Sequence, residues 1–371
     1  MARTRAAVIG LGRIASTIDD EIQVYDGHSL PYSHIACFRA VPEVEIVGMS
    51  DTWEEQREAA RQRWGFDAIY ADYRAMLDET RPDIVSVCTS AEPRASILID
   101  IAKGGYGVKA IWAEKPITIS LQEADDVVTA CNDAGIALAV NCTRRWMNNY
   151  TQALRMVNDG LIGDVIHVVA RARSGLSHNG SHMLTTLTMF TGGRAEWVVG
   201  ELGPDEDPMS DNDFTASGFL AFPNGVRGYF RALDNGPNDH SYDITGTTGM
   251  IRMMGDGRLS ELWTSEAPLP GQRNPQAARR FFPPEREVRA GAVNVIYDLI
   301  HCIETGDTPK CSGEDAREAL EIAIATRQSH RRGNVRVDLP VEDRRERIIS
   351  AEVINSGGIP RAIQRQRDAQ R

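Results

Sequence analysis

The residues of this chain that could carry chemistry begin with a glutamate and a lysine after a short apolar run. Residues 110–113 predict a buried strand, which should end before Pro116 because proline cannot donate to a neighbouring strand. Glu114 and Lys115 therefore fall at the carboxyl end of a strand, the edge of an open parallel sheet where ligands bind. Only four of the 41 basic residues are lysines, so a compact positive charge here is notable. The alternative is an exposed lysine beside a turn.

A second group of candidate residues follows the predicted strand Ala6–Ile9. Residues 10–15 have the pattern G-x-G-x-x-A, whose glycines allow a tight turn and close approach of a pyrophosphate. The strand Val44–Asp51 ends in an acid that can bind both ribose hydroxyls of NAD and would repel the extra phosphate of NADP. Thr89 and Ser90 end a further strand and could meet the same ligand. The predicted cofactor is NAD in preference to NADP, and its predicted contacts are Gly10, Gly12, Arg13, Ile14, Asp51, Thr89, Ser90, Glu114 and Lys115.

The spacing between the glycine turn and Asp51 is longer than the usual twenty or so residues. The additional residues, roughly 17–31, predict a loop that delays the first helix until Tyr32–Ala40. This insertion either borders the active site or is a plain surface excursion. Asp51 has an alternative role too, as the N-cap of a helix predicted at residues 54–64.

These candidates need a scaffold that brings strand ends together. Strands and helices alternate with short connections through residues 1–143, which predicts a parallel, doubly wound sheet of the α/β class. Further strands are predicted at Asp83–Thr89 and Ile136–Cys142, and further helices at Trp53–Trp64, Ala95–Lys103 and Leu121–Ala134.

Residues 144–340 have a different pattern, typical of an α+β domain with a large, open, mostly antiparallel sheet. Pro223–Gly225 predicts a hairpin turn. Residues 341–371 mix arginines with acids and predict either a flexible tail or an arm on a partner subunit. Strands are predicted at Val165–Arg173, Ala195–Leu202, Phe214–Phe222, Val226–Leu233, Ser241–Thr247 and Met250–Met254, and helices at Gln152–Asn158, Met183–Phe190, Val293–Glu304 and Glu314–His330.

The composition of the chain argues against some classes of binding partner and indicates in which cellular compartment the protein works. The chain has 371 residues, enough for two domains, and is 42% hydrophobic and 25% charged, an ordinary globular mixture. A net charge of −11 argues against nucleic acid, and no apolar run is long enough to span a bilayer. The six cysteines form no CxxC pair, as expected for reduced core cysteines of a cytoplasmic protein.

Taken in order, the glycine turn, Asp51, Glu114–Pro116 and Asp159–Asp164 resemble the Gfo/Idh/MocA family of NAD(P)-dependent sugar and cyclitol oxidoreductases. The closing segment 311–316 fits the same pattern, and the likeness covers residues 5–340. The resemblance implies an N-terminal Rossmann domain and places Lys115 between nicotinamide and substrate, with a cis bond to its proline. It also implies a homodimer or homotetramer.

The resemblance also points to a histidine pair. The family pattern Asp-x-Gly-x-His matches residues 178–182, so His182 is implied as the acid/base group and His178 stands in the place of the aspartate. A second histidine cannot supply that negative charge, although it could orient His182 or bind a substrate hydroxyl. A metal site is disfavoured because Gly180 lies between the histidines and no third ligand is evident. A purely structural pair is a further alternative.

Substrate contacts are expected from Arg145, Trp146 and Asn179. The Arg145–Trp146 pair resembles the family's Arg-aromatic pair near the substrate, and packing at a domain hinge is an equally plausible role. Asn141 and Arg144 also follow the fifth predicted strand, at the ligand edge. The other six histidines show no constellation and are expected at the surface or at helix ends: 28, 34, 167, 240, 301 and 330.

The resulting hypothesis is an NAD-dependent dehydrogenase that oxidises a secondary hydroxyl of a sugar, sugar derivative or cyclitol. His182 would remove the hydroxyl proton and Lys115 would counter the negative charge that develops on the oxygen. Two alternatives remain. One is redox-neutral chemistry with tightly held NAD, such as epimerisation, elimination or glycoside cleavage. The other is a non-catalytic sensor on the same fold.

Overall fold

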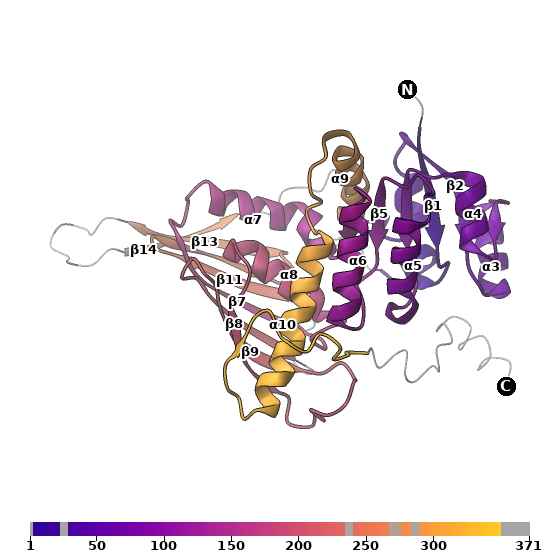
Figure 1. The fold of residues 1–371 in the computed structure, drawn as a ribbon. Coiled ribbons are helices and arrows are strands. Elements are labelled where there is room, and N and C mark those ends of the chain that lie inside the picture. The colour runs from indigo at the N-terminus through magenta and orange to yellow at the C-terminus, as the bar shows by residue number, and fades with distance from the viewer. Residues whose placement is uncertain are drawn as a thin grey trace. The chain divides into compact units, whose positions relative to one another are not determined.

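The computed structural model describes residues 3–22, 29–233, 240–266, 270, 273, 276–282 and 289–349. They form two compact units, each built around its own sheet (Figure 1). The first unit holds the described residues up to Thr143, together with Arg289–Arg317 and Ile349. The second holds those within Arg144–Val288 and Glu318–Ile348. No helix of the described residues is long and apolar enough to cross a membrane.

A six-stranded parallel sheet forms the centre of the first unit. In spatial order its strands are β3 (Ile69–Tyr70), β2 (Val44–Ser50), β1 (Thr4–Ile9), β4 (Ile84–Val87), β5 (Ala110–Ala113) and β6 (Ala137–Val140). Every residue of β4 and β5 is buried, as in strands covered on both faces. The order reverses between β1 and β4, where doubly wound sheets bind their ligands. The predicted α/β class is confirmed.

Helices connect these strands, and several of them begin or end at residues that commonly cap helices. The Ser120 hydroxyl accepts the Glu123 N–H at the start of α6, and the Asp72 carboxylate accepts the Arg74 N–H at the start of α4. Gly65 ends α3 with a φ of 60°. The helices are α3 (Glu54–Trp64), α4 (Tyr73–Thr80), α5 (Ala91–Lys103) and α6 (Leu121–Asp133).

The segment between β1 and β2 differs from the prediction. A four-residue helix, α1 (Arg13–Ser16), begins directly after the glycine turn, and α2 (His34–Arg39) follows the insertion. The first helix is therefore interrupted rather than delayed. Asp19, within the insertion, accepts the N–H groups of Tyr32 and Ser33 at 2.7 and 3.0 Å and so fixes the approach to α2. Residues 23–28 of the insertion lie outside the described residues.

Two further corrections concern the first unit. The two-residue strand β3 was not predicted, so the strand before Lys115 is the fifth and not the fourth. Residues 289–317 were assigned to the second domain, but they belong to the first unit. The reason is packing: α9 (Gly291–Thr305) packs against β5 and β6, and Figure 1 shows it beside β5. The Val140 N–H also donates to the Cys311 carbonyl at 2.9 Å.

The described residues of the second unit form a nine-stranded sheet, and among these strands only β7 and β10 pair in parallel. This confirms the predicted, mostly antiparallel sheet. The predicted hairpin turn joins β9 to β10, with Gly225 at a φ of 86°. Strands β13, β14 and β15 were not predicted. In spatial order the strands are β14 (Gln276–Phe282), β13 (Leu259–Glu266), β12 (Gly249–Met254), β11 (His240–Gly246), β7 (Val165–Arg173), β10 (Arg227–Leu233), β9 (Ala216–Ala221), β8 (Trp197–Leu202) and β15 (Val337–Asp338).

Helices complete the second unit. They include α7 (Asn148–Asn158) and α8 (Gly180–Thr191). The helix α8 packs against the strands β7 and β10. The helix α10 (Gly313–Arg331) begins in the first unit and continues into the second.

The C-terminal segment corrects the prediction of a tail from residue 341. The buried Arg327 donates from Nε to Glu346 Oε1 at 2.7 Å and also bonds the Arg347 carbonyl. Ile348 is buried. Residues 341–348 are thus part of the second unit, while residues 350–371 lie outside the described residues.

Candidate active site

The glycine turn after β1 has the geometry that its sequence predicts. Gly10 has a φ of 86° and its N–H donates to the Ser50 carbonyl at 2.8 Å. A Cβ on Gly10 would lie 3.0 Å from backbone atoms of Cys88 and Thr89, so both conformation and space exclude a side chain. At Gly12 a Cβ would meet none of the described atoms within 4 Å. The first glycine makes the turn, and the second leaves clearance for a ligand phosphate.

Asp51 lies beside this turn and is bonded to it. Its Oδ2 accepts the Leu11 N–H at 2.7 Å and its Oδ1 accepts the Trp53 N–H at 2.8 Å. Burial raises the pKa of Asp51 above its ordinary value, and the two hydrogen bonds oppose that shift. Asp51 is not the N-cap of α3, because Trp53 holds that position. Each carboxylate oxygen can accept a second hydrogen bond, so ribose hydroxyls remain possible partners.

The other residues predicted to meet the cofactor surround the same turn. Arg13 is exposed and pairs with Glu21 at 2.9 Å, and Ile14 is half-buried. Ser90 is exposed at the start of α5. The Thr89 hydroxyl is buried and has no hydrogen-bond partner among the described residues. Buried polar groups are nearly always satisfied, so this hydroxyl fits a polar group of a bound ligand.

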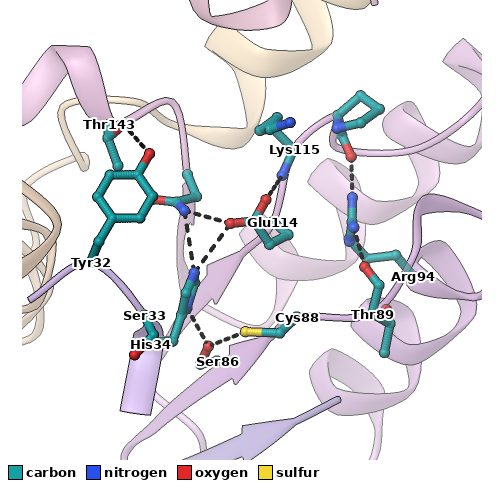
Figure 2. Close-up of polar contacts among 12 residues, drawn as sticks. Tyr32, Ser33, His34, Ser86, Cys88, Thr89, Arg94, Glu114, Lys115 and Thr143 are labelled. Carbon is teal, nitrogen blue, oxygen red and sulfur yellow. Dashed lines mark hydrogen bonds and ion pairs between the residues drawn. The ribbon is translucent and has the colours of Figure 1, made fainter. Parts of the chain in front are cut away.

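A buried arginine forms hydrogen bonds with the backbone next to Lys115. Arg94, on α5, donates to the Thr89 carbonyl after β4 and to the Pro116 carbonyl after β5 (Figure 2). Burial lowers the pKa of Arg94 to about 10, so the guanidinium stays charged at neutral pH. Lys115 is half-buried and its bond to Pro116 is cis. Arg94 therefore ties together the two strand ends that carry Thr89 and Lys115. It was not predicted from the sequence.

The Glu114 carboxylate is buried, and both of its oxygens meet polar groups of the protein (Figure 2). Its Oε1 accepts a hydrogen bond from Asn141 and lies 3.2 Å from His34 Nε2, while Oε2 accepts the Lys115 N–H at 3.1 Å. Burial raises the pKa of Glu114, but its hydrogen bonds and the neighbouring positive charge outweigh that effect and hold it at about 2. Glu114 is thus an ionised internal group, and its predicted contact with the cofactor stays a prediction.

The environment of His34 differs from the prediction. The residue begins α2, a helix end as expected, but its side chain is fully buried and belongs to a cluster of hydrogen-bonded polar groups. Its Nδ1 lies 2.7 Å from Ser86 Oγ, and its ring stacks on Trp112 with 3.6 Å between centroids. Burial lowers the pKa of His34, against the effect of Glu114. The partners are 52 and 80 residues away in sequence, so no local pattern could reveal them.

In the second unit the predicted histidines lie at the start of α8. His182 is buried in the first turn of that helix, His178 is half-buried just before it, and Asn179 is the exposed N-cap. Asp213 accepts the N–H groups of Ser177 and His178 at 2.8 and 2.9 Å. A carboxylate therefore fixes the backbone at His178. Within the described residues, no group of three His, Cys, Asp or Glu is placed to hold a metal ion.

Arg145 and Trp146 pack inside the second unit. Trp146 is 1% exposed, and the buried Arg145 donates from Nε and from a terminal nitrogen to the Thr185 carbonyl at 3.0 and 2.8 Å. These contacts anchor α8, the helix that carries His182. They favour a supporting role for Arg145, and its predicted contact with substrate stays a prediction.

A second constellation missed by the sequence analysis involves His240. Arg144 forms a two-point ion pair with Asp256 at 2.8 and 2.9 Å, and the Tyr150 hydroxyl donates to the same carboxylate at 2.6 Å. A terminal nitrogen of Arg144 lies 2.9 Å from His240 Nδ1. Guanidinium can only donate, so Nδ1 must be the acceptor and the neutral ring carries its proton on Nε2. The His240 and His182 rings meet edge to face, with 6.4 Å between centroids.

These two histidines, His34 and His240, predict a loss of stability in mild acid. Burial, with help from Arg144, lowers the pKa of His240 to about 3, and burial lowers the pKa of His34. Below about pH 6.5 these two histidines therefore bind protons in the unfolded chain but stay neutral in the folded chain. The free energy of unfolding falls as the pH falls from there towards 3. The slope reaches at most about 1.4 kcal/mol per pH unit for each histidine, and less for the partly exposed His240.

Urea unfolding at pH 7, 6 and 5 measures this slope. His240→Asn should flatten it, since the amide oxygen can accept from Arg144 but cannot take a proton in this range. His301→Asn, at an exposed histidine of α9 that lies 2.8 Å from Asp307, is the control for loss of a histidine as such and should not flatten the slope. An equal slope in wild type and His240→Asn would contradict the prediction.

The fold and the glycine turn together define a class. A parallel sheet of order 3-2-1-4-5-6, with a glycine turn after β1 and an acid after β2, is a dinucleotide-binding Rossmann domain. The clearance at Gly12 and the buried Thr89 hydroxyl fit a dinucleotide at that edge. An α+β unit with a large sheet accompanies this domain.

Comparison with known families places the chain within that class. The model described as an oxidoreductase family with an NAD-binding Rossmann fold matches residues 4–142, and the GFO/IDH/MocA C-terminal domain matches residues 150–252. The chain belongs to the Gfo/Idh/MocA family of oxidoreductases.

Individual relatives agree with this assignment. The chain is 26% identical to D-apiose dehydrogenase of Paraburkholderia graminis, over 81% of this chain and 85% of the relative. It is 23% identical to myo-inositol 2-dehydrogenase of Thermotoga maritima, over 88% and 96%. A crystal structure of an oxidoreductase from Agrobacterium radiobacter, in complex with NAD+, L-tartaric acid and magnesium, superposes with a TM-score of 0.73. That likeness covers 91% of this chain and 98% of the other at 17% identity, and it concerns the fold alone.

Proposed function

We propose that the protein is an NAD-dependent dehydrogenase that oxidises a secondary hydroxyl of a sugar, sugar derivative or cyclitol. The observation that carries the proposal is the common edge of the first sheet. Lys115 follows β5 at the edge where Gly10 follows β1 and Asp51 follows β2. The similarity to apiose and inositol dehydrogenases supports the substrate class. A cytoplasmic homodimer or homotetramer completes the proposal.

The first unit has the groups that a bound dinucleotide requires. The turn at Gly10 and Gly12 would receive the pyrophosphate, Asp51 the ribose hydroxyls, and the Thr89 hydroxyl a polar group further along the ligand. When bound, NAD supplies the nicotinamide ring that accepts a hydride. The residues of this chain bind it, orient it and move the proton.

Lys115 and His182 divide the remaining work between them. Oxidation takes a hydride from the carbinol carbon and a proton from its hydroxyl. His182 would accept that proton as general base, which requires a neutral imidazole. The Lys115 ammonium would hydrogen-bond the same oxygen and counter the negative charge that develops there. His178, beside the start of α8, would orient His182 or bind a neighbouring substrate hydroxyl.

Asp51 would set the preference for NAD over NADP. Asp51→Asn keeps the shape and one acceptor but removes the charge, so NAD should bind about 10- to 100-fold more weakly, as expected for the loss of charged hydrogen bonds. NADP should lose much less, because its extra phosphate is no longer repelled. Titration of both cofactors by calorimetry measures the ratio, with the exposed N-cap change Asp72→Asn as the control. An unchanged NAD/NADP ratio would rule out this role for Asp51.

The direct test is nicotinamide absorbance during incubation of the protein with NAD and pooled cyclitols, hexoses, uronic acids and glycosides. A rise that depends on one pool establishes a dehydrogenase and identifies its substrate class. NAD that co-purifies with the protein, with sugar consumed and no rise in absorbance, would instead indicate redox-neutral chemistry. Binding of NAD without turnover in any pool would favour a sensor.

A further inference from the structure

The buried imidazole of His34 has no part in the chemistry assigned so far, yet its environment is specific. The residue is 0% exposed, and its side chain contacts residues from two strands of the first sheet and from the segment that follows one of them. Figure 2 shows the polar contacts among these. Ser86 comes from β4, Trp112 from β5, and Glu114 from the position directly after β5. A side chain that only packs the core would need no contact beyond the stack on Trp112. Both ring nitrogens of His34 instead meet polar partners.

The charge of Glu114 assigns the ring proton of His34 to Nε2. The Glu114 carboxylate accepts from Asn141 and from the Lys115 N–H, so it is ionised and can only accept. His34 Nε2 lies 3.2 Å from Glu114 Oε1 and also 3.2 Å from Asn141 Nδ2, which can only donate. A hydrogen bond to a buried charged acceptor is the stronger of the two, so we assign Nε2 as the donor to Glu114. Nδ1 is then the acceptor, and the Ser86 hydroxyl donates to it at 2.7 Å.

The chain of donors continues to a cysteine. Because the Ser86 proton points to His34, Ser86 Oγ is left to accept from the Cys88 thiol, 3.2 Å away. The hydrogen bonds thus run in one direction, from Cys88 through Ser86 and His34 to Glu114. Burial raises the pKa of the Cys88 thiol, which keeps its proton in place. Each proton in this chain of bonds therefore has a defined acceptor.

We infer that His34 is a positioning residue that acts on Lys115 through Glu114. The imidazole donates to Oε1 of the carboxylate. Oε2 of the same carboxylate accepts the backbone N–H of Lys115 at 3.1 Å. The carboxylate also attracts the Lys115 ammonium, which favours its charged form. His34 would thereby fix both the position and the charge of a lysine that it does not touch. The catalytic consequence rests on the proposed function.

Two substitutions separate this role from simple packing. His34→Phe keeps a ring on Trp112 but removes the donor to Glu114. His34→Gln removes the ring but places an amide N–H near the position of Nε2. If His34 positions Lys115, the Phe variant should lose about 10- to 100-fold in kcat with the KM for NAD little changed, and the Gln variant should recover most of the loss. If His34 only fills space, the Gln variant should be the worse of the two.

A readout that needs no substrate is available because the chain has only four lysines. Reductive methylation with labelled formaldehyde gives each lysine a carbon resonance that can be titrated, and Lys115→Met assigns one of them. In Glu114→Gln the Lys115 resonance should titrate at lower pH, because a negative charge has been removed. In His34→Phe it should shift as well. The resonances of Lys103, Lys109 and Lys310 serve as internal controls and should not move.

The two readouts separate failure of this inference from failure of the proposed function. A Lys115 resonance that is identical in wild type and His34→Phe would overturn the inference, whatever the enzyme turns over. A resonance that shifts, in a protein that oxidises no pooled substrate, would leave the positioning role standing and remove the dehydrogenase. In an active enzyme, His34→Phe should add little to the loss of kcat in the Glu114→Gln background, since both act along one path. Full additivity would count against the path.

Discussion

Replacement of Lys115 by methionine is expected to lower kcat by about 10²- to 10³-fold, the usual cost of removing one donor from a developing oxyanion. Methionine keeps the length and the apolar stem of the side chain and removes only the ammonium. The backbone at residue 115 should stay in place, because Glu114 and Arg94 hold it through main-chain atoms. NAD affinity should change little, since the turn at Gly10 and the carboxylate of Asp51 are untouched. Stopped-flow or steady-state absorbance with the identified substrate, together with calorimetric titration of NAD, gives both numbers.

The control for this prediction is Lys103→Met, an exposed lysine at the end of α5 in the same unit. It makes the same chemical change in the same domain and should leave kcat unaltered. Turnover by Lys115→Met at close to the wild-type rate would remove Lys115 from the mechanism. It would also remove the observation on which the proposed function stands.

The parts of the fold that could be predicted share one property, a strong local pattern. The strands of the first sheet are short apolar runs, as is typical of a parallel sheet that is covered on both faces. The strands that were missed lack this signal. β3 and β15 have two residues each, and β13 and β14 mix charged with apolar side chains beside segments rich in proline and glycine. Their pairing is decided by neighbours that are far away in sequence.

The same distinction applies to the candidate site. Gly10, Asp51 and Lys115 could be found because each lies within two residues of the end of a strand, and the ends of parallel strands meet at one edge. His34, Arg94 and the Arg144–Asp256 pair could not be found, because each is defined by its partners. Arg144 and Asp256, for example, are 112 residues apart. Residues proposed to touch a ligand lie at predictable places on this fold, whereas the residues that support them are visible only in three dimensions.

The position of His182 in the second unit leads to the second large prediction. His182→Asn should lower kcat by about 10²- to 10⁴-fold, because no general base would remain to accept the hydroxyl proton. Asparagine preserves polarity at a buried site, and the helix around it should persist, since α8 is anchored through the Thr185 carbonyl by Arg145. NAD binding should be retained, because the residues proposed to hold it all belong to the first unit.

Addition of imidazole distinguishes a missing base from a damaged site. In His182→Ala, which leaves a cavity, free imidazole should restore part of the lost rate by supplying the base in solution. It should restore nothing in Lys115→Met, where the missing group is a cation. His301→Ala, at an exposed histidine of α9, should match wild type throughout. Full activity in His182→Asn would contradict the assignment, and the base would then have to be sought at His178, whose backbone Asp213 already fixes at the entry to the same helix.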